Sequence, residues 1–419
     1  MTSDRALLRR LFDAAVAAAM PKVGLRAHLP PRPRGRTVVV GAGKGAAQLA
    51  QALEAAWDGP LSGVVVTRYG YGAPCARIEV LEAAHPEPDA AGLAATARLF
   101  AAVEGLTADD LVIALVCGGG SALLPAPPAG VTLADEIALN RALLASGAPI
   151  SAMNVLRKHV SRIKGGRLAL AAAPARVASL VVSDIPGDDP WLVASGPTIP
   201  DPAGVAEALE VVRRYRLDLP RSILDHLASG EAAAPHPGDA AFARNTTAVI
   251  ASSGVSLEAA AAVAEAAGVR AAILSDAVEG EAREVARVHA AIAREIVARG
   301  RPFPRPVVLL SGGETTVTLR GDGKGGRNCE FLLSLALGIE GVGGIAALAA
   351  DTDGIDGASD AAGGFVDGGT AGRIRDRGRD PGRLLEANDA WTALDLAGDL
   401  LVTGPTGTNV NDFRAILIR

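Results

Sequence analysis

Hydrophobic and polar positions divide the first 185 residues into short apolar runs separated by longer, Ala-rich stretches. Continuous Val, Ile and Leu runs are typical of strands that are buried on both faces of a parallel sheet. They predict strands at residues 37–40, 63–67, 77–82, 111–116 and 177–182. The stretches between them predict helices at residues 43–57, 88–103 and 151–163. Because strands and helices alternate, we predict an α/β domain that is Rossmann-like and doubly wound.

The alternation stops at a segment rich in Pro, Gly and Ala, residues 230–240, which is typical of a linker or an exposed loop. It then restarts. The second half predicts strands at residues 248–251, 271–274, 307–310, 345–350, 400–403 and 414–418, helices at 257–267 and 280–298, and a hairpin-like continuation at 315–319. We therefore predict two α/β domains, residues 1–240 and 241–419, and the last strand could return to the first domain.

Composition and charge exclude several classes of function. Aromatic residues make up 3% of the chain, too few for the stacking platforms that bind single-stranded nucleic acid. The net charge of −5 at pH 7 gives no attraction for nucleic acid or an anionic membrane, and no apolar run is long enough to span a membrane. The three cysteines are far apart in the sequence, which favours a reducing compartment, so we expect a cytoplasmic protein.

Two glycine-rich loops follow predicted strands of the first half, where a ligand is expected in an open α/β sheet. Their residues are Gly41, Gly43 and Lys44 in one loop and Gly118, Gly119, Gly120 and Ser121 in the other. Glycine lets backbone amides approach an anion, and a helix N-terminus attracts negative charge. The first loop fits the dinucleotide-binding pattern only loosely. In addition, the next strand is followed by Arg68, where a dinucleotide-binding protein has an acidic residue that holds the ribose. Binding of NADP stays open, and the other alternative is that both loops are plain tight turns that bind no ligand.

Charged residues gather at two further places in the first half. Arg157, Lys158, His159 and Lys164 precede or flank two glycines, Gly165 and Gly166. Such a basic group suits a carboxylate or phosphate, although a solvated helix face is the alternative. After the strand at 177–182 come Asp184, Asp188 and Asp189. A carboxylate there can bind Mg²⁺ or take a proton from a substrate hydroxyl, while turns and helix caps are the alternative.

Two loops of the second half have the same character. The first contains Gly312, Gly313 and Glu314, and continues to Gly325, Gly326, Arg327 and Asn328. Its glycines, its arginine and the helix that follows predict an anion site. The second contains Asp351, Asp353 and Asp356 but has Ile355 and Ala362 where an EF-hand needs acidic ligands. A Mg²⁺ site completed by phosphates fits better, and a turn-rich surface loop is the alternative.

Together these loops supply what phosphoryl transfer requires: cations for the transferred group, glycine amides for phosphates, and carboxylates for Mg²⁺ and the nucleophile. No G-x-S-x-G elbow and no zinc motif occurs in the sequence. The residue types and their places therefore favour a kinase over a hydrolase.

Taken in order, the loops resemble the bacterial glycerate 2-kinase family. The matching runs of the first half are residues 41–44 (GAGK), 85–86 (HP), 118–123 (GGGSAL), 157–159 (RKH), 164–168 (KGGRL), 183–184 (SD) and 187–190 (GDDP). The second half resembles that family's MOFRL domain through residues 311–314 (SGGE), 325–328 (GGRN), 352–354 (TDG) and 404–410 (GPTGTNV). Because the matches run through nearly the whole chain, they are far more specific than any one loop.

The resemblance implies two α/β domains with the active site in the cleft between them, a requirement for ATP and Mg²⁺, D-glycerate as the acceptor and 2-phosphoglycerate as the product. It implies that Lys44 and Arg327 stabilise the transferred phosphate. The expected substrate-binding residues are Ser121, Arg157, Lys158, His159 and Lys164. The expected nucleotide-binding residues are Gly41, Gly43, Gly118, Gly119, Gly120, Gly312, Gly313, Glu314, Gly325, Gly326 and Asn328. From their chemistry we choose Asp189 to orient the hydroxyl, and Asp351 and Asp353 to bind the metal.

Two other functions stay open. Members of the family have also carried the label hydroxypyruvate reductase, an activity that would use the Gly41 loop for NAD(P)H but leaves Arg327 and Asp351 without a role. A non-catalytic regulator would bind glycerate or phosphate without turnover. The sequence leaves a homodimer open, and we expect a small-molecule partner with no nucleic acid and no membrane.

Overall fold

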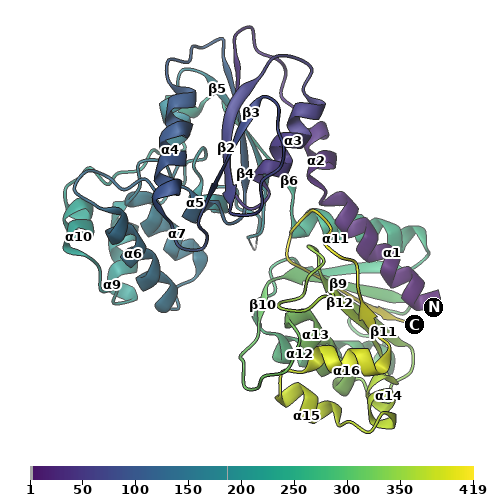
Figure 1. Ribbon diagram of the computed structural model, residues 1–419. Helices are drawn as coiled ribbons and strands as arrows, with labels where there is room; N and C mark the ends of the chain where they lie inside the picture. The colour runs from purple at the N-terminus through teal and green to yellow at the C-terminus, as the bar shows by residue number, and fades with distance from the viewer. Residues whose placement is uncertain (1–2, 186) are drawn as a thin grey trace. The chain divides into compact units, whose positions relative to one another are not determined.

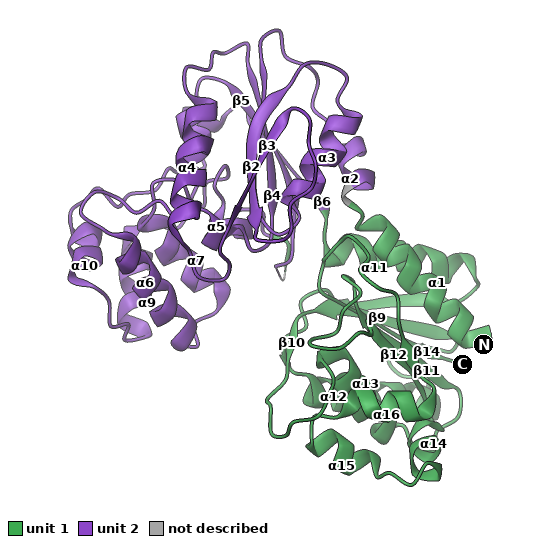
Figure 2. Ribbon diagram, viewed as in Figure 1, with its two compact units in different colours: residues 1–20, 186–188, 251–419 green, residues 21–185, 189–250 purple. Residues whose placement is uncertain are grey.

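The computed structural model describes residues 3–185 and 187–419, and these form two compact units (Figures 1 and 2). Unit 2 contains residues 21–185 and 189–250. Unit 1 contains the described residues 3–20, 187–188 and 251–419. No helix in the described part of the chain is both long and apolar enough to cross a membrane.

Unit 2 is built on a six-stranded sheet of order β3-β2-β1-β4-β5-β6. The strands are β1 (Thr37–Ala42), β2 (Ser62–Arg68), β3 (Ile78–Ala83), β4 (Leu111–Cys117), β5 (Arg176–Val182) and β6 (Thr246–Ala251). The pairings of β1 with β2 and β4, of β2 with β3 and of β4 with β5 are parallel. This is the strand order of a Rossmann fold, in which the winding reverses between β1 and β4. The predicted Rossmann-like architecture is confirmed.

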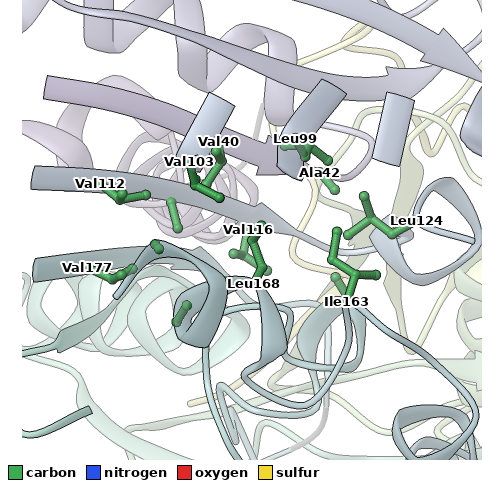
Figure 3. Close-up of a cluster of buried hydrophobic side chains, with 14 of the residues drawn as sticks. Val40, Ala42, Leu99, Val103, Val112, Val116, Leu124, Ile163, Leu168 and Val177 are labelled. Carbon is green, nitrogen blue, oxygen red and sulfur yellow. The ribbon is translucent and has the colours of Figure 1, made fainter. Parts of the chain in front are cut away.

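Helices α3 (Ala46–Ala56) and α4 (Ala90–Val103) cover the two faces of this sheet, and α2 (Pro21–Ala27) packs on α3. The short helices α5 (Gly120–Leu123) and α8 (Arg167–Ala172) also contact its strands. A separate apolar cluster is formed by α6 (Leu133–Ala145), α7 (Ile150–His159), α9 (Val205–Arg214) and α10 (Arg221–Ala228). Figure 1 shows α3 and α4 on opposite sides of the strands. In the core, Val40, Val112 and Val116 of the sheet meet Leu99 and Val103 of α4 (Figure 3). The β-branched side chains explain why these apolar runs form strands.

Unit 1 has a mixed six-stranded sheet of order β13-β12-β11-β14-β9-β7. The strands are β7 (Arg270–Ser275), β9 (Val307–Gly313), β11 (Ile345–Asp351), β12 (Gly363–Asp367), β13 (Leu400–Leu401) and β14 (Asp412–Ile418). Only the β7–β9 pairing is parallel among the described pairings of this sheet. A separate pair joins β8 (Gly280–Glu281) to β10 (Thr315–Thr316) in parallel, so the predicted hairpin at 315–319 is wrong. The reason is a turn at Gly313, whose φ of +114° redirects the chain towards β8.

The helices of unit 1 form two layers around this sheet. They are α1 (Ser3–Ala18), α11 (Ser253–Ala266), α12 (Ala282–Arg299), α13 (Arg327–Gly338), α14 (Thr370–Asp376), α15 (Pro381–Glu386) and α16 (Ala390–Ala397). One apolar core joins α1 and α11 to the sheet through residues such as Phe12, Leu257 and Leu348. A second core joins α12, α13 and α16 to the other face, with Phe331, Leu309 and Ile416 among its members. Unit 1 is therefore also a layered α/β structure.

The observed division differs from the predicted domains at both ends of unit 2. Helix α1 belongs to unit 1, because its apolar stripe packs on the second sheet and the Phe12 ring lies 5.9 Å from that of Phe413. Strand β6 joins the first sheet beside β5, so the chain leaves unit 2 after residue 250 and not near residue 240. The last strand, β14, lies between β11 and β9 of unit 1 and does not return to unit 2.

Candidate active site

The loops that follow β1 and β4 are joined at the point where the winding of the unit 2 sheet reverses. The amide of Lys44 donates to the carbonyl of Gly118 at 2.9 Å. Gly43 has a φ of +136°, and a Cβ atom there would lie 2.4 Å from the carbonyl oxygen of Cys117. Only glycine fits so close an approach. Two of the predicted loops therefore form one structure at the position where open α/β sheets bind ligands.

A cation, an imidazole and a carboxylate surround the second glycine loop. A Cβ atom on Gly119, whose φ is +77°, would lie 3.0 Å from Cγ of Lys44 and 3.1 Å from Nε2 of His85. A Cβ atom on Gly118 would overlap the carboxylate of Asp184, at 1.7 Å from Oδ2. We call Lys44, His85, Gly118, Gly119 and Asp184 the glycine-loop cluster. The bare glycine backbone beside Lys44 fits a phosphate group.

His85 is neutral at ordinary pH in this cluster. Partial burial and the positive charges of Lys44 and Arg68 lower its pKa from 6.5 to about 4. His85 belongs to a run that resembles the family, but the sequence predicts no role for it. A histidine followed by proline after a strand edge carries little signal by itself, and only the fold brings it beside Lys44.

We expect His85→Asn to make unfolding less sensitive to acid. The unfolded chain takes up a proton on His85 below pH 6.5, whereas the folded protein resists protonation down to about pH 4. The stabilisation by neutral His85 is thus present above pH 6.5 and lost as the pH falls towards 4. Because the side chain is only half-buried, we expect roughly 1–2 kcal/mol after solvent screening. Urea unfolding at pH 7 and at about pH 4.5 measures it.

The matched control is His236→Asn, which changes an exposed histidine of the same unit. It should leave the difference in unfolding free energy between the two pH values as in the wild type. An equal acid sensitivity in the wild type and in His85→Asn would contradict the expected role of His85.

A second network in unit 2 connects Ser121 to Arg157. Oγ of Ser121 lies 2.9 Å from Oγ of Ser195, which donates to Oδ1 of Asn154 at 2.9 Å. Arg157 donates from Nη1 to the same Asn154 oxygen at 3.3 Å. Ser195 has a φ of +59°, an unfavourable conformation for a non-glycine residue that this network holds in place. Two predicted substrate-binding residues, Ser121 and Arg157, are therefore linked through Asn154.

The other basic residues predicted to bind substrate have structural partners instead. Lys158 forms a buried ion pair with Asp201, and Lys164 forms one with Glu136 at 2.9 Å. His159 is fully buried, with Nδ1 2.6 Å from the carbonyl oxygen of Val155. Each lysine side chain is 2% exposed, so its charge is already compensated inside the protein. These contacts give Lys158, His159 and Lys164 a structural role, and substrate binding by them stays a prediction.

Asp184, and not Asp189, is the carboxylate that lies against the glycine loop. Asp189 is half-buried in the following turn, where its carbonyl accepts from the amide of Leu192 at 3.0 Å. The role of Asp189 in orienting a hydroxyl stays a prediction. Sequence spacing could not separate the two residues, because both follow β5 within a few positions.

In unit 1, Arg327 stands among three carboxylates. Its Nε donates to Asp412 at 2.6 Å, Nη2 to Asp351 at 2.8 Å and Nη1 to Glu314 at 3.1 Å. Its side chain is 23% exposed. We call Arg327, Glu314, Asp351 and Asp412 the arginine cluster. A guanidinium anchored on a partly exposed side chain is suited to a phosphate or carboxylate ligand.

The two carboxylates predicted to bind metal lie at the carboxyl end of β11. Burial raises the pKa of Asp351 well above its usual range, Arg327 opposes this, and the charges of Asp353 and Asp412 add to it. Oδ1 of Asp351 accepts from the amide of Asp353 at 3.1 Å, and Oδ1 of Asp353 accepts from that of Ile355 at 2.8 Å. In the described part of the chain, no three His, Cys, Asp or Glu side chains form a metal site. Two adjacent carboxylates still fit Mg²⁺, which usually takes one or two of them together with phosphates.

Gly326, one of the glycines predicted to bind a nucleotide, is required by close packing at the start of α13. Asp356 accepts from the amides of Asn328 at 3.0 Å and Cys329 at 2.8 Å, and so occupies the N-terminus of α13. A Cβ atom on Gly326 would strike that carboxylate, at 2.4 Å from Oδ1. An internal carboxylate thus accepts from the amides at this helix start, and nucleotide binding by Gly325, Gly326 and Asn328 stays a prediction.

Gly312 and Gly313 are likewise explained by close packing. A Cβ atom on Gly312 would lie 2.0 Å from Oγ of Ser253, and one on Gly313 would lie 2.3 Å from the amide nitrogen of Val278. Glu314 is exposed and contacts Arg327. Gly41 has the same character, since its Cβ would lie 2.5 Å from the carbonyl of Leu115. These residues shape the loops, and nucleotide binding by them stays a prediction.

Two family models match the chain. Residues 7–228 match a domain of unknown function (DUF4147), and residues 307–412 match the MOFRL family. The fold and these matches thus define a two-unit α/β protein that contains a MOFRL domain.

Three relatives identify the family more closely. The chain is 39% identical to the D-glycerate 2-kinase of Thermotoga maritima over 412 residues, 98% of this chain and 97% of the relative. The crystal structure of a glycerate kinase from T. maritima superposes with a TM-score of 0.91 at 38% identity, covering all of both chains. A protein of Agrobacterium vitis named putative hydroxypyruvate reductase is 54% identical over 99% of this chain and 95% of its own length. The chain belongs to the glycerate kinase family.

Proposed function

We propose that this protein is an ATP-dependent kinase that transfers a phosphoryl group to the 2-hydroxyl of D-glycerate, giving 2-phosphoglycerate and ADP. The observation that carries the proposal is Arg327, held by three carboxylates on a side chain that is 23% exposed. An arginine so placed can stabilise the charge that develops on a phosphoryl group in transfer. The full-length likeness to a D-glycerate 2-kinase supports the choice of acceptor.

The residues of the two clusters and their neighbours have different roles in this reaction. Lys44 and the backbone of Gly118–Gly120 would bind phosphate oxygens, and Arg327 would stabilise the transferred group. Arg157 and Ser121 would bind the glycerate carboxylate, since a guanidinium and a hydroxyl suit that group. Asp184 or Asp189 would accept the proton of the 2-hydroxyl. Asp351 and Asp353 would hold Mg²⁺, which neutralises phosphate charge when bound.

We expect Asp353→Asn to raise the Mg²⁺ concentration that gives half-maximal activity by roughly tenfold, because one of two metal carboxylates loses its charge. Initial rates over a Mg²⁺ titration, together with Mn²⁺ binding followed by electron paramagnetic resonance, measure the change. Asp360→Asn is the control, since Asp360 is an exposed carboxylate that pairs with Lys324. Identical titrations for the wild type and Asp353→Asn would remove Asp353 from the metal site.

The function itself is tested by a phosphorus NMR time course of the protein with ATP, Mg²⁺ and D-glycerate. A growing 2-phosphoglycerate resonance with an equal amount of ADP is the expected result. A 3-phosphoglycerate resonance would keep the kinase and overturn the choice of hydroxyl. No consumption of ATP would contradict the proposal as a whole.

The rival function is the reductase named for the Agrobacterium vitis relative. A dinucleotide-binding Rossmann unit commonly has an acidic residue after the second strand, to hold the ribose. Here β2 ends at Arg68, whose guanidinium stacks on the Tyr71 ring at 3.6 Å. Loss of NADPH or NADH absorbance with hydroxypyruvate would favour the reductase. Binding of D-glycerate without turnover of any of these substrates would favour the regulator.

The cellular location of the protein is also a proposal. All three cysteines are free, which fits a reducing compartment, so we propose a cytoplasmic enzyme. Self-association into a homodimer stays a prediction, to be measured by sedimentation.

A further inference from the structure

Asp412 is a buried carboxylate that contacts two residues at the start of α13. Its Oδ1 accepts from Nε of Arg327 at 2.6 Å and from Nδ2 of Asn328 at 2.8 Å. The residue is 1% exposed. It lies at the first position of β14, directly after the run of residues 404–410 that resembles the family. None of the roles derived above uses Asp412.

The other oxygen of Asp412 is held by the sheet. Oδ2 accepts from the amide of Thr315 at 3.2 Å and from its hydroxyl at 3.3 Å. Arg414, also buried, forms an ion pair with the same oxygen and donates to the carbonyl of Gly312 at 3.3 Å. Two cations and three neutral donors thus fix the carboxylate of Asp412 in one place. Because Asp412 belongs to the sheet, it also fixes Arg327 relative to the sheet.

The three carboxylates around Arg327 are not equivalent. Glu314 has a side chain that is 53% exposed, so a ligand can displace it from Nη1 at little cost. Asp351 is a proposed metal ligand, so it can give up its contact with Nη2 of Arg327 and bind the metal cation in its place. Asp412 is enclosed on every side and cannot exchange. Nε is therefore permanently bound, while the edge formed by Nη1 and Nη2 can receive another anion.

We propose that Asp412 is the positioning residue for Arg327: it holds Nε so that the Nη1–Nη2 edge faces the phosphoryl group. The inference rests on the proposed kinase function only for the identity of the ligand. An edge with two parallel N–H groups matches a phosphate, and its direction must be set before the ligand arrives.

Asp399 provides a matched control for a purely structural role. It is also 1% exposed, lies in unit 1, and pairs with Arg373 at 2.6 Å and with Thr370 at 3.1 Å. In the described part of the chain, its side-chain partners are Arg5, Thr370 and Arg373, none of which belongs to the arginine cluster. Loss of charge at Asp399 should therefore destabilise the fold without affecting Arg327.

The experiment compares Asp412→Asn with Asp399→Asn. We expect both to lower the melting temperature, but only Asp412→Asn to lower kcat, by roughly 10- to 100-fold, with KM values for ATP and D-glycerate within about threefold of the wild type. The ¹⁵Nε resonance of Arg327, assigned by its loss in Arg327→Lys, should shift and its proton exchange faster only in Asp412→Asn. The double variant Asp412→Asn/Arg327→Ala should be no slower than Arg327→Ala.

Several results would overturn the proposal. They are a kcat of Asp412→Asn near that of the wild type, an unchanged Nε resonance, or a double variant slower than Arg327→Ala by the full factor of Asp412→Asn. If Asp412→Asn does not fold, Thr315→Val removes one donor to Oδ2 and should still shift the Nε resonance and lower kcat severalfold. If the wild type has no kinase activity, the proposed function fails, and the Nε resonance alone then decides the positioning role.

Discussion

Arg327→Ala should lower kcat by roughly 10³-fold, the scale expected when a cation that stabilises transition-state charge is lost. The same change leaves Asp412 and Asp351 without their shared cation, so we also expect a loss of stability. Steady-state kinetics must therefore be expressed per folded protein, as measured by near-ultraviolet circular dichroism. KM for D-glycerate should change little, because the proposed contact is with the transferred group.

Two further variants separate charge from geometry at this position. Arg327→Lys keeps the charge but cannot present two parallel donors, so we expect a loss of roughly 10²-fold. Arg379→Ala removes an exposed arginine of unit 1 and should have wild-type activity. Near-wild-type turnover in Arg327→Ala would remove Arg327 from the mechanism.

Lys44→Ala should lower kcat/KM for ATP by roughly 10²- to 10³-fold, because it removes the cation beside the glycine loop. The Lys44 side chain lies against Gly119, because its Cγ would be 3.0 Å from a Cβ atom added there. No other side chain of the glycine-loop cluster can take the place of Lys44 unless the cluster rearranges. Calorimetric titration with ATP and steady-state kinetics measure the effect. Lys22→Ala, which changes an exposed lysine on α2, is the control in the same unit.

A second readout of Lys44→Ala does not depend on activity. Lys44 is one of the charges that lower the pKa of His85 to about 4, so its removal should move the NMR titration of His85 to higher pH. Wild-type kinetics with a shifted His85 titration would place Lys44 in the cluster but outside the reaction. An unshifted titration would contradict the described geometry itself.

The elements that sequence reasoning found are those with strong local signals. Continuous apolar runs such as residues 111–116 predict strands well, because burial on both faces leaves no room for polar residues. Strand β12, Gly363–Asp367, was missed because two of its five residues are glycines, which carry no strand preference. Helix α1 has an apolar stripe, but the sequence contains no sign of which sheet that stripe covers.

The residues of the candidate site also separate into those that local sequence signals predict and those that they do not. Gly43, Gly119 and Arg327 were found from loop composition, which reports what a segment can do. Partner choice depends on distances across the fold: Lys158 and Lys164 pair with Asp201 and Glu136, residues 43 and 28 positions away, and loop composition does not reveal these ion pairs. Asp412 was missed because a single acidic residue before an apolar strand resembles an ordinary turn.

The placement of α1 has a consequence for how the protein is made. The helix is synthesised before unit 2, whereas the strand that carries Phe413 is synthesised after all of unit 2. At about 5–20 residues per second, α1 waits roughly 20 to 80 seconds for the sheet that buries its leucines. An isolated 16-residue helix is marginal in water, so this apolar stripe stays exposed during that time. Nascent chains should therefore depend on chaperones that bind α1, and a fragment of residues 251–419 made alone should aggregate through the part of its sheet that α1 covers and α11 does not.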